Sequence, residues 1–211
     1  TSGDSACGIR KDSPHLKAAV DDFPRRHGKG TLFGNAKFRE YLKSTKYVKN
    51  ATSQAELAKL LRTIQIFQKY AAMYDFDWLM LAAQGYQESG LDQNVGSKVG
   101  AVGVMQVMPA TGKELGVGDI RQLEPNIHAG AKYLRGLIER YFPDAHFDEL
   151  NRCLFAFAAY NAGPARVAGL RKEAQRRGLD PNVWFDHVGR VAAEKVGQEP
   201  VRYVGNIFKY Y

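Results

Sequence analysis

The sequence predicts a mainly α protein, and three observations support this class. After Thr52, apolar residues recur at helical spacing in one segment after another, while alternating apolar and polar runs are nearly absent. Residues typical of helix starts and ends separate these segments. Hydrophobic residues are 45% and charged residues 25% of the 211 residues, which is ordinary for a globular chain. This length predicts one domain plus an extra piece, with a core that needs no metal or disulfide.

The first fifty residues differ from the rest because they are polar, interrupted by glycine and only weakly periodic. Residues 12–14, Asp-Ser-Pro, indicate the start of a short helix through Phe23, since proline is favoured in a first helical turn. Residues 25–35 are predicted to form a loop. We therefore divide the chain into a small N-terminal extension, residues 1–50, and a main domain, residues 51–211.

The main domain is predicted to be a series of helices joined by short loops. Ser53-Gln-Ala-Glu56 has the pattern of a capping box at a helix start. The next helix is predicted at residues 77–89, with Gly90 as its C-cap. Residues 92–108 lack a helical period, so a loop with a small hairpin is expected there. Further helices are predicted from residue 109 and at residues 127–141, 148–160, 164–177, 183–196 and 199–210.

The net charge and the hydropathy of the chain limit the kinds of partner that it can have. The net charge of +8 suits a polyanion or an anionic membrane face. The basic residues are scattered, however, and no nucleic-acid-binding motif accompanies them. The densest groups, at residues 25–27 and 171–177, are predicted to be solvated faces. The longest apolar run, residues 153–160, is too short to span a bilayer. The start at Thr1 without a signal region leads us to expect a processed or truncated form.

The two cysteines, Cys7 and Cys153, fit neither a disulfide-rich scaffold nor a metal cluster. Cys153 lies in an apolar run, so a buried, unreactive thiol is expected. A bridge between the two cysteines in an oxidising compartment is the alternative.

Several common chemistries lack their motifs. There is no G-x-S-x-G elbow and no Walker loop, and Gly34 follows Gly28-Lys-Gly30 one residue too late for a dinucleotide-binding loop. The five histidines do not have metal-ligand spacing. We therefore predict no cofactor and no metal, which leaves carboxylate chemistry or a binding role.

The sequence around Glu88 makes this residue a candidate catalytic carboxylate. It ends the helix predicted at residues 77–89, where the helix dipole disfavours negative charge. Trp78, Leu81 and Tyr86 nearby would remove it from water. Both effects raise the pKa of a carboxyl group, and a carboxyl protonated near neutral pH is what a general acid requires. Taken alone, however, a glutamate at a helix end is usually a surface residue.

Four ordered motifs change that interpretation. They are Glu88-Ser89, Gly103-Val-Met-Gln106, Ala159-Tyr-Asn-Ala-Gly163 and Glu199-Pro-Val-Arg-Tyr203-Val204. In this order and spacing, over residues 65–211, the chain resembles the soluble-lytic-transglycosylase family of peptidoglycan-cleaving enzymes. Val104 and Pro200 replace the leucine and threonine that are usual in that family.

The resemblance implies a lysozyme-like catalytic domain with one catalytic carboxyl, Glu88. As an acid, Glu88 would protonate the oxygen that links N-acetylmuramic acid (MurNAc) to N-acetylglucosamine (GlcNAc). As a base, it would then take the proton of the MurNAc C6 hydroxyl, which attacks C1 and closes a 1,6-anhydro ring. The attacking hydroxyl is tethered to the sugar, so proximity replaces the second carboxylate of an ordinary glycosidase.

The resemblance also implies substrate-binding residues around Glu88. Ser89 would orient Glu88 or a substrate carbonyl, Met105 would exclude water, and Gln106 would bond sugar groups. Tyr160 and Asn161 would offer a hydroxyl and an amide, and Tyr203 would bond Glu88. The structural alternatives are helix capping for Ser89, loop packing for residues 105–106, helix termination for residues 160–161 and a core position for Tyr203.

The same resemblance implies peptidoglycan glycan strands as substrate, no nucleic acid, a periplasmic location and a monomer whose partners are cell-wall synthesis or amidase proteins. Residues 9–20 look like the closing strand and helix of a periplasmic solute-binding domain, which membrane-bound members of the family join to the catalytic domain. Contact with the outer membrane would then come only through a missing anchor. An ordinary N-terminal extension is the alternative for residues 1–50.

Two other functions remain open. A hydrolytic muramidase of the goose-type lysozyme kind would need a carboxylate that positions water, and Asp92 or Asp119 are the nearest candidates. A non-catalytic peptidoglycan-binding module would leave Glu88 solvated.

Overall fold

The structure is a computed structural model that describes residues 16–18, 20–22 and 54–211. The chain divides into two units, Thr1–Asn50 and Ala51–Tyr211. In the first unit the described residues are helical, which agrees with the short helix predicted there. The following expectations lie outside the described residues: the helix start at residues 12–14, the loop at residues 25–35, the basic group at residues 25–27, the state of Cys7 and the capping box at Ser53.

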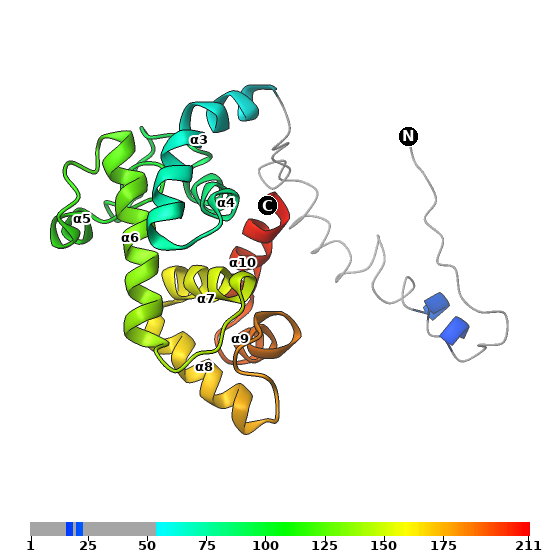
Figure 1. Ribbon diagram of the computed structural model, residues 1–211. Helices are drawn as coiled ribbons and strands as arrows, with labels where there is room; N and C mark the ends of the chain where they lie inside the picture. The colour runs from blue at the N-terminus through cyan, green and yellow to red at the C-terminus, as the bar shows by residue number, and fades with distance from the viewer. Residues whose placement is uncertain (1–15, 19, 23–53) are drawn as a thin grey trace. The chain divides into compact units, whose positions relative to one another are not determined.

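The described part of the second unit is built of helices (Figure 1). They are α3 (Gln54–Tyr74), α4 (Trp78–Ser89), α5 (Pro109–Leu115), α6 (Leu123–Tyr141), α7 (Glu149–Ala162), α8 (Pro164–Arg176), η2 (Trp184–Val188), α9 (Gly189–Lys195) and α10 (Gln198–Tyr210). Between α4 and α5, isolated antiparallel bridges join Val102 to Gly96 and to Val107. The mainly α class and the small hairpin are therefore confirmed.

Local signals set the ends of α4, the helix that carries Glu88. The Asp77 side chain caps its start by accepting hydrogen bonds from the backbone N–H groups of Leu79 and Met80, at 2.7 and 3.0 Å. Gly90 ends it, as predicted, in the left-handed conformation with φ 69°. These two ends place Glu88 in the last turn of the helix.

The single helix predicted at residues 183–196 is wrong. Phe185 is extended, and Asp186 is left-handed with φ 60°, so the chain turns within η2 before α9 begins. The indole of Trp184 is fully buried, and a Cβ on Gly189 would lie only 2.9 Å from Trp184 O. Burial of this large ring against the first turn of α9 outweighs the helical preference of the segment.

Helix α7 lies at the centre of the core. Its residues 153–159 are at most 1% exposed, and it packs against α6, α8 and α10, which surround it in Figure 1. A helix that is apolar all round is buried on every side. Cys153 is accordingly a free, buried thiol, as expected, and burial raises its pKa to about 11.

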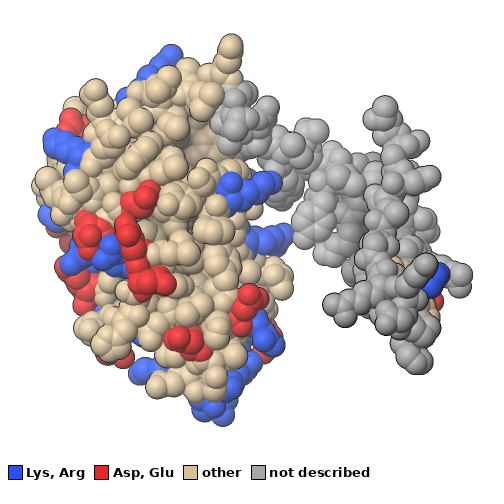
Figure 2. All heavy atoms as spheres, turned by 45° about the vertical axis from the view of Figure 1, so that its right-hand side comes forward, with Lys and Arg blue, Asp and Glu red and all other residues tan. Residues whose placement is uncertain are grey.

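The basic group at residues 171–177 is not a free polyanion-binding surface. Arg176 and Arg177 both pair with Glu173, as expected of solvated faces. For Arg171 that expectation is wrong, because this side chain is buried, lies over the Phe147 ring and donates to Pro181 O. On the face in Figure 2, acidic and basic side chains are interspersed. In the described part of the chain, no helix combines the length and apolarity that a bilayer span requires.

His128 should make the stability of this unit depend on pH. Its ring stacks on Tyr70 with centroids 4.2 Å apart, and its Nε2 lies 2.7 Å from the Tyr74 hydroxyl. Burial, followed by the charges of Lys132 and Lys69, lowers the pKa of His128, so the folded state binds this proton less tightly than the unfolded state. The contribution of neutral His128 to the free energy of unfolding should be complete above the unfolded-state pKa of about 6.5. It should be lost as the pH falls below that value.

Denaturant unfolding between about pH 5 and pH 8 measures this effect. The wild type should lose unfolding free energy more steeply towards low pH than His128→Gln does. Equal slopes in the two proteins would contradict the prediction.

Candidate active site

Glu88 is half-buried in the last turn of α4. Burial raises the pKa of its carboxyl group, and the hydrogen bond from Tyr203 acts in the opposite direction. Burial is the larger effect, so the carboxyl keeps its proton to a higher pH than a solvated glutamic acid does. The desolvation expected from the sequence is therefore present.

Tyr203 of α10 donates a hydrogen bond from its hydroxyl to Glu88 Oε1, as predicted. The two residues are 115 positions apart in the sequence, and the packing of α10 against α4 brings them together (Figure 1). Burial and the charge of Glu88 raise the pKa of Tyr203 well above its usual value, so the phenol stays protonated and can donate. Pro200 lies in the first turn of α10, where its missing N–H is not needed.

The loop of residues 103–106 lies against the end of α4. Val104 and Met105 are fully buried, and a Cβ on Gly85 of α4 would lie 3.0 Å from Val104 Cγ1. Ser89 joins the two segments, because its Oγ lies 3.0 Å from Val104 O and 3.2 Å from Gly85 O and accepts from Asp92 N. The contacts of Ser89 thus hold the loop to the helix end, and Ser89 makes no hydrogen bond to Glu88.

Tyr160 of α7 supports the same loop. Its hydroxyl donates to Met105 O at 2.6 Å. Burial, followed by the charge of Glu88, raises the pKa of Tyr160 well above its usual value. Tyr160 therefore lies within electrostatic reach of Glu88, while its hydroxyl donates to the backbone of the loop.

Gln106 and Asn161 do not form hydrogen bonds with Glu88. Gln106 is left-handed with φ 47°, and its Nε2 donates to Val95 O at 3.0 Å and to Gly103 O at 2.8 Å. Asn161 lies in the last turn of α7, and its Oδ1 is buried without a hydrogen-bond partner. The sugar contacts expected of both residues stay predictions.

Asn126 of α6 holds the loop together, and our reading of the sequence missed it. It is 0% exposed, its Oδ1 accepts from Met105 N, and its Nδ2 donates to Val102 O and Ile120 O, each at 2.8 Å. A Cβ on Gly103 would lie 2.5 Å from this amide, so only glycine fits there. The available signal was an asparagine directly before the helix predicted at residues 127–141 and one helical turn before Gly130.

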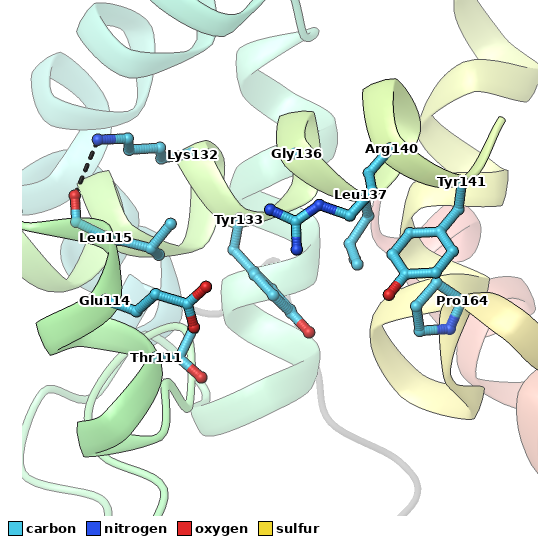
Figure 3. Close-up of a pocket in the computed structure, with 10 residues that line it drawn as sticks. All are labelled: Thr111, Glu114, Leu115, Lys132, Tyr133, Gly136, Leu137, Arg140, Tyr141 and Pro164. Carbon is cyan, nitrogen blue, oxygen red and sulfur yellow. Dashed lines mark hydrogen bonds between the residues drawn. The ribbon is translucent and has the colours of Figure 1, made fainter. Parts of the chain in front are cut away.

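A pocket of about 100 Å³ opens between α5, α6 and the start of α8 (Figure 3). Figure 3 shows the ring of Tyr133, the carboxylate of Glu114 and the guanidinium of Arg140 facing it. Tyr133 also packs edge to face against Tyr160, with centroids 5.4 Å apart. One residue that lines the pocket, Tyr133, is therefore in contact with one of the predicted site residues, Tyr160.

Asp92 and Asp119, the acids considered for activating water, close local turns. Asp92 Oδ1 accepts from Asn94 N at 2.9 Å, and Asp119 Oδ1 accepts from Arg121 N at 3.0 Å. Neither makes a hydrogen bond to Glu88. Each carboxylate thus has a structural use that does not involve the candidate acid.

The model of the transglycosylase SLT domain family matches residues 65–183, more than half of the chain. The chain belongs to this family. Among curated relatives, membrane-bound lytic murein transglycosylase F of Shewanella woodyi is 38% identical over 166 residues, and the protein of that name from Pseudomonas fluorescens is 36% identical over 158. These alignments cover 72% and 69% of this chain but 34% and 32% of the relatives. The chain thus spans about a third of their length.

A solved structure also resembles this SLT-family chain. It is the X-ray structure of an inactive mutant of lytic transglycosylase Slt from Pseudomonas aeruginosa, with a TM-score of 0.52 and 23% identity. The match covers 92% of this chain and 28% of that one. At this identity the likeness concerns the fold, and it confirms the lysozyme-like fold that the sequence resemblance implied.

Proposed function

We propose that this chain carries a lytic transglycosylase domain that cleaves the β-1,4 bond between MurNAc and GlcNAc in peptidoglycan and leaves 1,6-anhydro-MurNAc ends. The observation that carries the proposal is the half-buried Glu88 carboxyl, whose pKa is raised and which accepts a hydrogen bond from Tyr203. The printed names of the relatives support murein as the substrate class.

In the proposed mechanism Glu88 acts first as an acid and then as a base. Its proton passes to the glycosidic oxygen as the bond from that oxygen to MurNAc C1 breaks. The resulting carboxylate takes the proton of the MurNAc C6 hydroxyl, whose oxygen bonds to C1, so Glu88 ends as it began and no water is consumed. The Tyr203 hydroxyl stabilises the carboxylate between the two steps.

The competing functions have less support. A hydrolase needs a second carboxylate to activate water or to act as the nucleophile, and both candidates for that role serve in local turns. A binding module has no use for a carboxyl whose pKa is raised by burial, because such a group is poised for proton transfer.

The other predicted site residues receive roles in the same proposal. Met105 excludes water from Glu88, and Ser89 and Tyr160 hold the loop that carries it. Asn161 offers its unpaired Oδ1 to a substrate N–H or O–H, and Gln106 its Oε1. No cofactor or metal takes part.

The location and partners belong to the proposal as well. We place the chain in the periplasm, where peptidoglycan lies. The name of the membrane-bound relatives supports an association with a membrane, and we propose that this is the outer membrane, reached through other parts of the full-length protein. We also propose that the protein is a monomer and that its partners are cell-wall synthesis or amidase proteins. Residues 1–50 are proposed to be the tail of a solute-binding domain.

Mass spectrometry of the soluble products from purified peptidoglycan tests the function. Anhydro-muropeptides, each one water lighter than a hydrolysed product, are expected. Products with free reducing ends would establish a muramidase instead. Binding without any product would favour the non-catalytic module.

Tyr203→Phe should change the pH dependence of the reaction. The lost hydrogen bond is the influence that lowers the pKa of Glu88, so the pKa should rise further. A general acid works only while protonated, so the alkaline limb of the kcat/KM profile should move to higher pH. The rate at the optimum should fall about tenfold, because the carboxylate loses its stabilising donor.

Tyr211→Phe is the matched control, since this tyrosine is 50% exposed at the end of the same helix. It should leave the profile unchanged. An alkaline limb that stays in place in Tyr203→Phe would show that the bond does not set the pKa of Glu88.

A further inference from the structure

Gln84 is a fully buried polar residue next to the candidate site. It lies on α4 one helical turn before Glu88 and is 0% exposed. Its Nε2 donates to the Tyr203 hydroxyl oxygen at 3.3 Å, while its Oε1 is buried without a hydrogen-bond partner. An unpaired buried carbonyl oxygen is destabilising, so this atom requires an explanation.

The three side chains form a short chain of hydrogen bonds. The Gln84 amide donates to Tyr203, and Tyr203 donates to Glu88 Oε1. This direction suits an ionised Glu88, because a carboxylate only accepts hydrogen bonds. A protonated Glu88 also has a donor, and the direction of the chain can then reverse.

We propose that Gln84 is a positioning residue that keeps Tyr203 bonded to Glu88 in both protonation states of that carboxyl. When Glu88 is protonated, its O–H donates to the Tyr203 oxygen, and the Tyr203 hydroxyl turns towards Gln84. The amide rotates so that its Oε1 accepts, which gives the unpaired atom its partner. No proton leaves its residue in this rearrangement. The proposal rests on the function proposed above, in which Glu88 alternates between acid and base.

Glutamine suits this task because one planar group carries both a donor and an acceptor. An aliphatic side chain offers neither, and a carboxylate offers only acceptors. Water is a poor substitute here, because Gln84 is fully buried and Tyr203 is 8% exposed. Among the described residues, Tyr203 of α10 is the titratable group that influences the pKa of Glu88, and the charge of Glu88 in turn raises the pKa of Tyr203 and of Tyr160 on α7.

A double-mutant cycle tests the proposal by kinetics. Gln84→Met, close in size but apolar, should lower kcat about tenfold and leave KM within about twofold, since it affects the reacting state and not substrate contacts. In the Tyr203→Phe background, the same substitution should have no further effect, because Gln84 acts only through Tyr203. Losses that multiply in the double variant would overturn the proposal.

Thr63→Val is the matched control for removing a buried polar group. Thr63 is 2% exposed on α3, and its hydroxyl bonds only to the backbone of its own helix, at Lys59 O and Leu60 O. This variant should retain the wild-type kcat. A drop equal to that of Gln84→Met would show that loss of any buried polar group slows the enzyme, and would overturn the specific role.

A second measurement needs no turnover, and its main observation is made on the wild-type protein. The side-chain amide of Gln84, labelled with ¹⁵N, should shift with pH at the same midpoint as the ¹³C-labelled carboxyl of Glu88. This response should vanish in Glu88→Gln and in Tyr203→Phe. A Gln84 amide resonance that does not shift as Glu88 titrates would overturn the proposal even in an active enzyme. A coupled titration in a protein without activity would instead support the hydrogen-bond chain and refute the proposed function.

Discussion

Replacing Glu88 with glutamine should reduce the cleavage of peptidoglycan by about a thousandfold or more, with no loss of folding. The amide keeps the size of the side chain and can still accept the Tyr203 hydrogen bond. It cannot, however, give a proton to the glycosidic oxygen or take one from the C6 hydroxyl. Release of soluble products, followed over time by mass spectrometry, measures the loss.

The same substitution should raise stability at neutral pH. Burial raises the pKa of Glu88 in the folded state, so its stabilising contribution is complete below the unfolded-state pKa, about 4.3, and is lost as the pH rises. Glu88→Gln carries no buried charge, so its advantage in unfolding free energy should grow from acidic to neutral pH.

Glu139→Gln is the matched control, because Glu139 is exposed on α6 and, within the part of the chain that the structure describes, pairs only with Arg135. It should retain full activity. A Glu88→Gln protein that cleaves at the wild-type rate would contradict the role of Glu88. An inactive protein with a lowered melting temperature at neutral pH would contradict the predicted gain in stability.

Asn126→Ala should cause the largest loss of stability, about 2 to 4 kcal/mol in the free energy of unfolding. It leaves the buried Met105 N–H without its partner, and it removes one hydrogen bond each from Val102 O and Ile120 O, which keep Val107 N and Gln93 Nε2 as donors. The loop that carries Met105 should then open, and the activity should fall with it. Denaturant unfolding and product release measure the two effects.

Asn94→Ala provides a control in the same segment between α4 and α5. Asn94 is exposed, and among the described residues it bonds only to Asp92, so loss of its side chain should cost less than about 1 kcal/mol and leave the activity intact. If Asn126→Ala keeps both wild-type stability and wild-type rate, the three hydrogen bonds do not hold the loop.

Local sequence signals predicted most helix ends correctly because those ends depend on neighbouring residues. Asp77 and Gly90 bracket α4, and proline starts α5 and α8, through backbone preferences that act within one or two turns. The helix predicted at residues 183–196 was wrong because its conformation depends on contacts outside the segment's local pattern. Its helical periodicity is real, but burial of Trp184 against Gly189 is a packing requirement that no local pattern reports.

By itself the sequence determined the mainly α class, the order of the helices and the position of Glu88 at a helix end. Only the tertiary structure decided which hydrogen-bond partner each motif residue has. Tyr203 donates to Glu88. Ser89 and Tyr160 donate to the backbone of residues 104 and 105, and Gln106 donates to the backbone of its own turn. The roles of Asn126 and Gln84 could be recognised only from the tertiary structure. Hydrogen bonds between residues far apart in the sequence depend on how helices pack, and burial then determines whether a carboxyl keeps its proton.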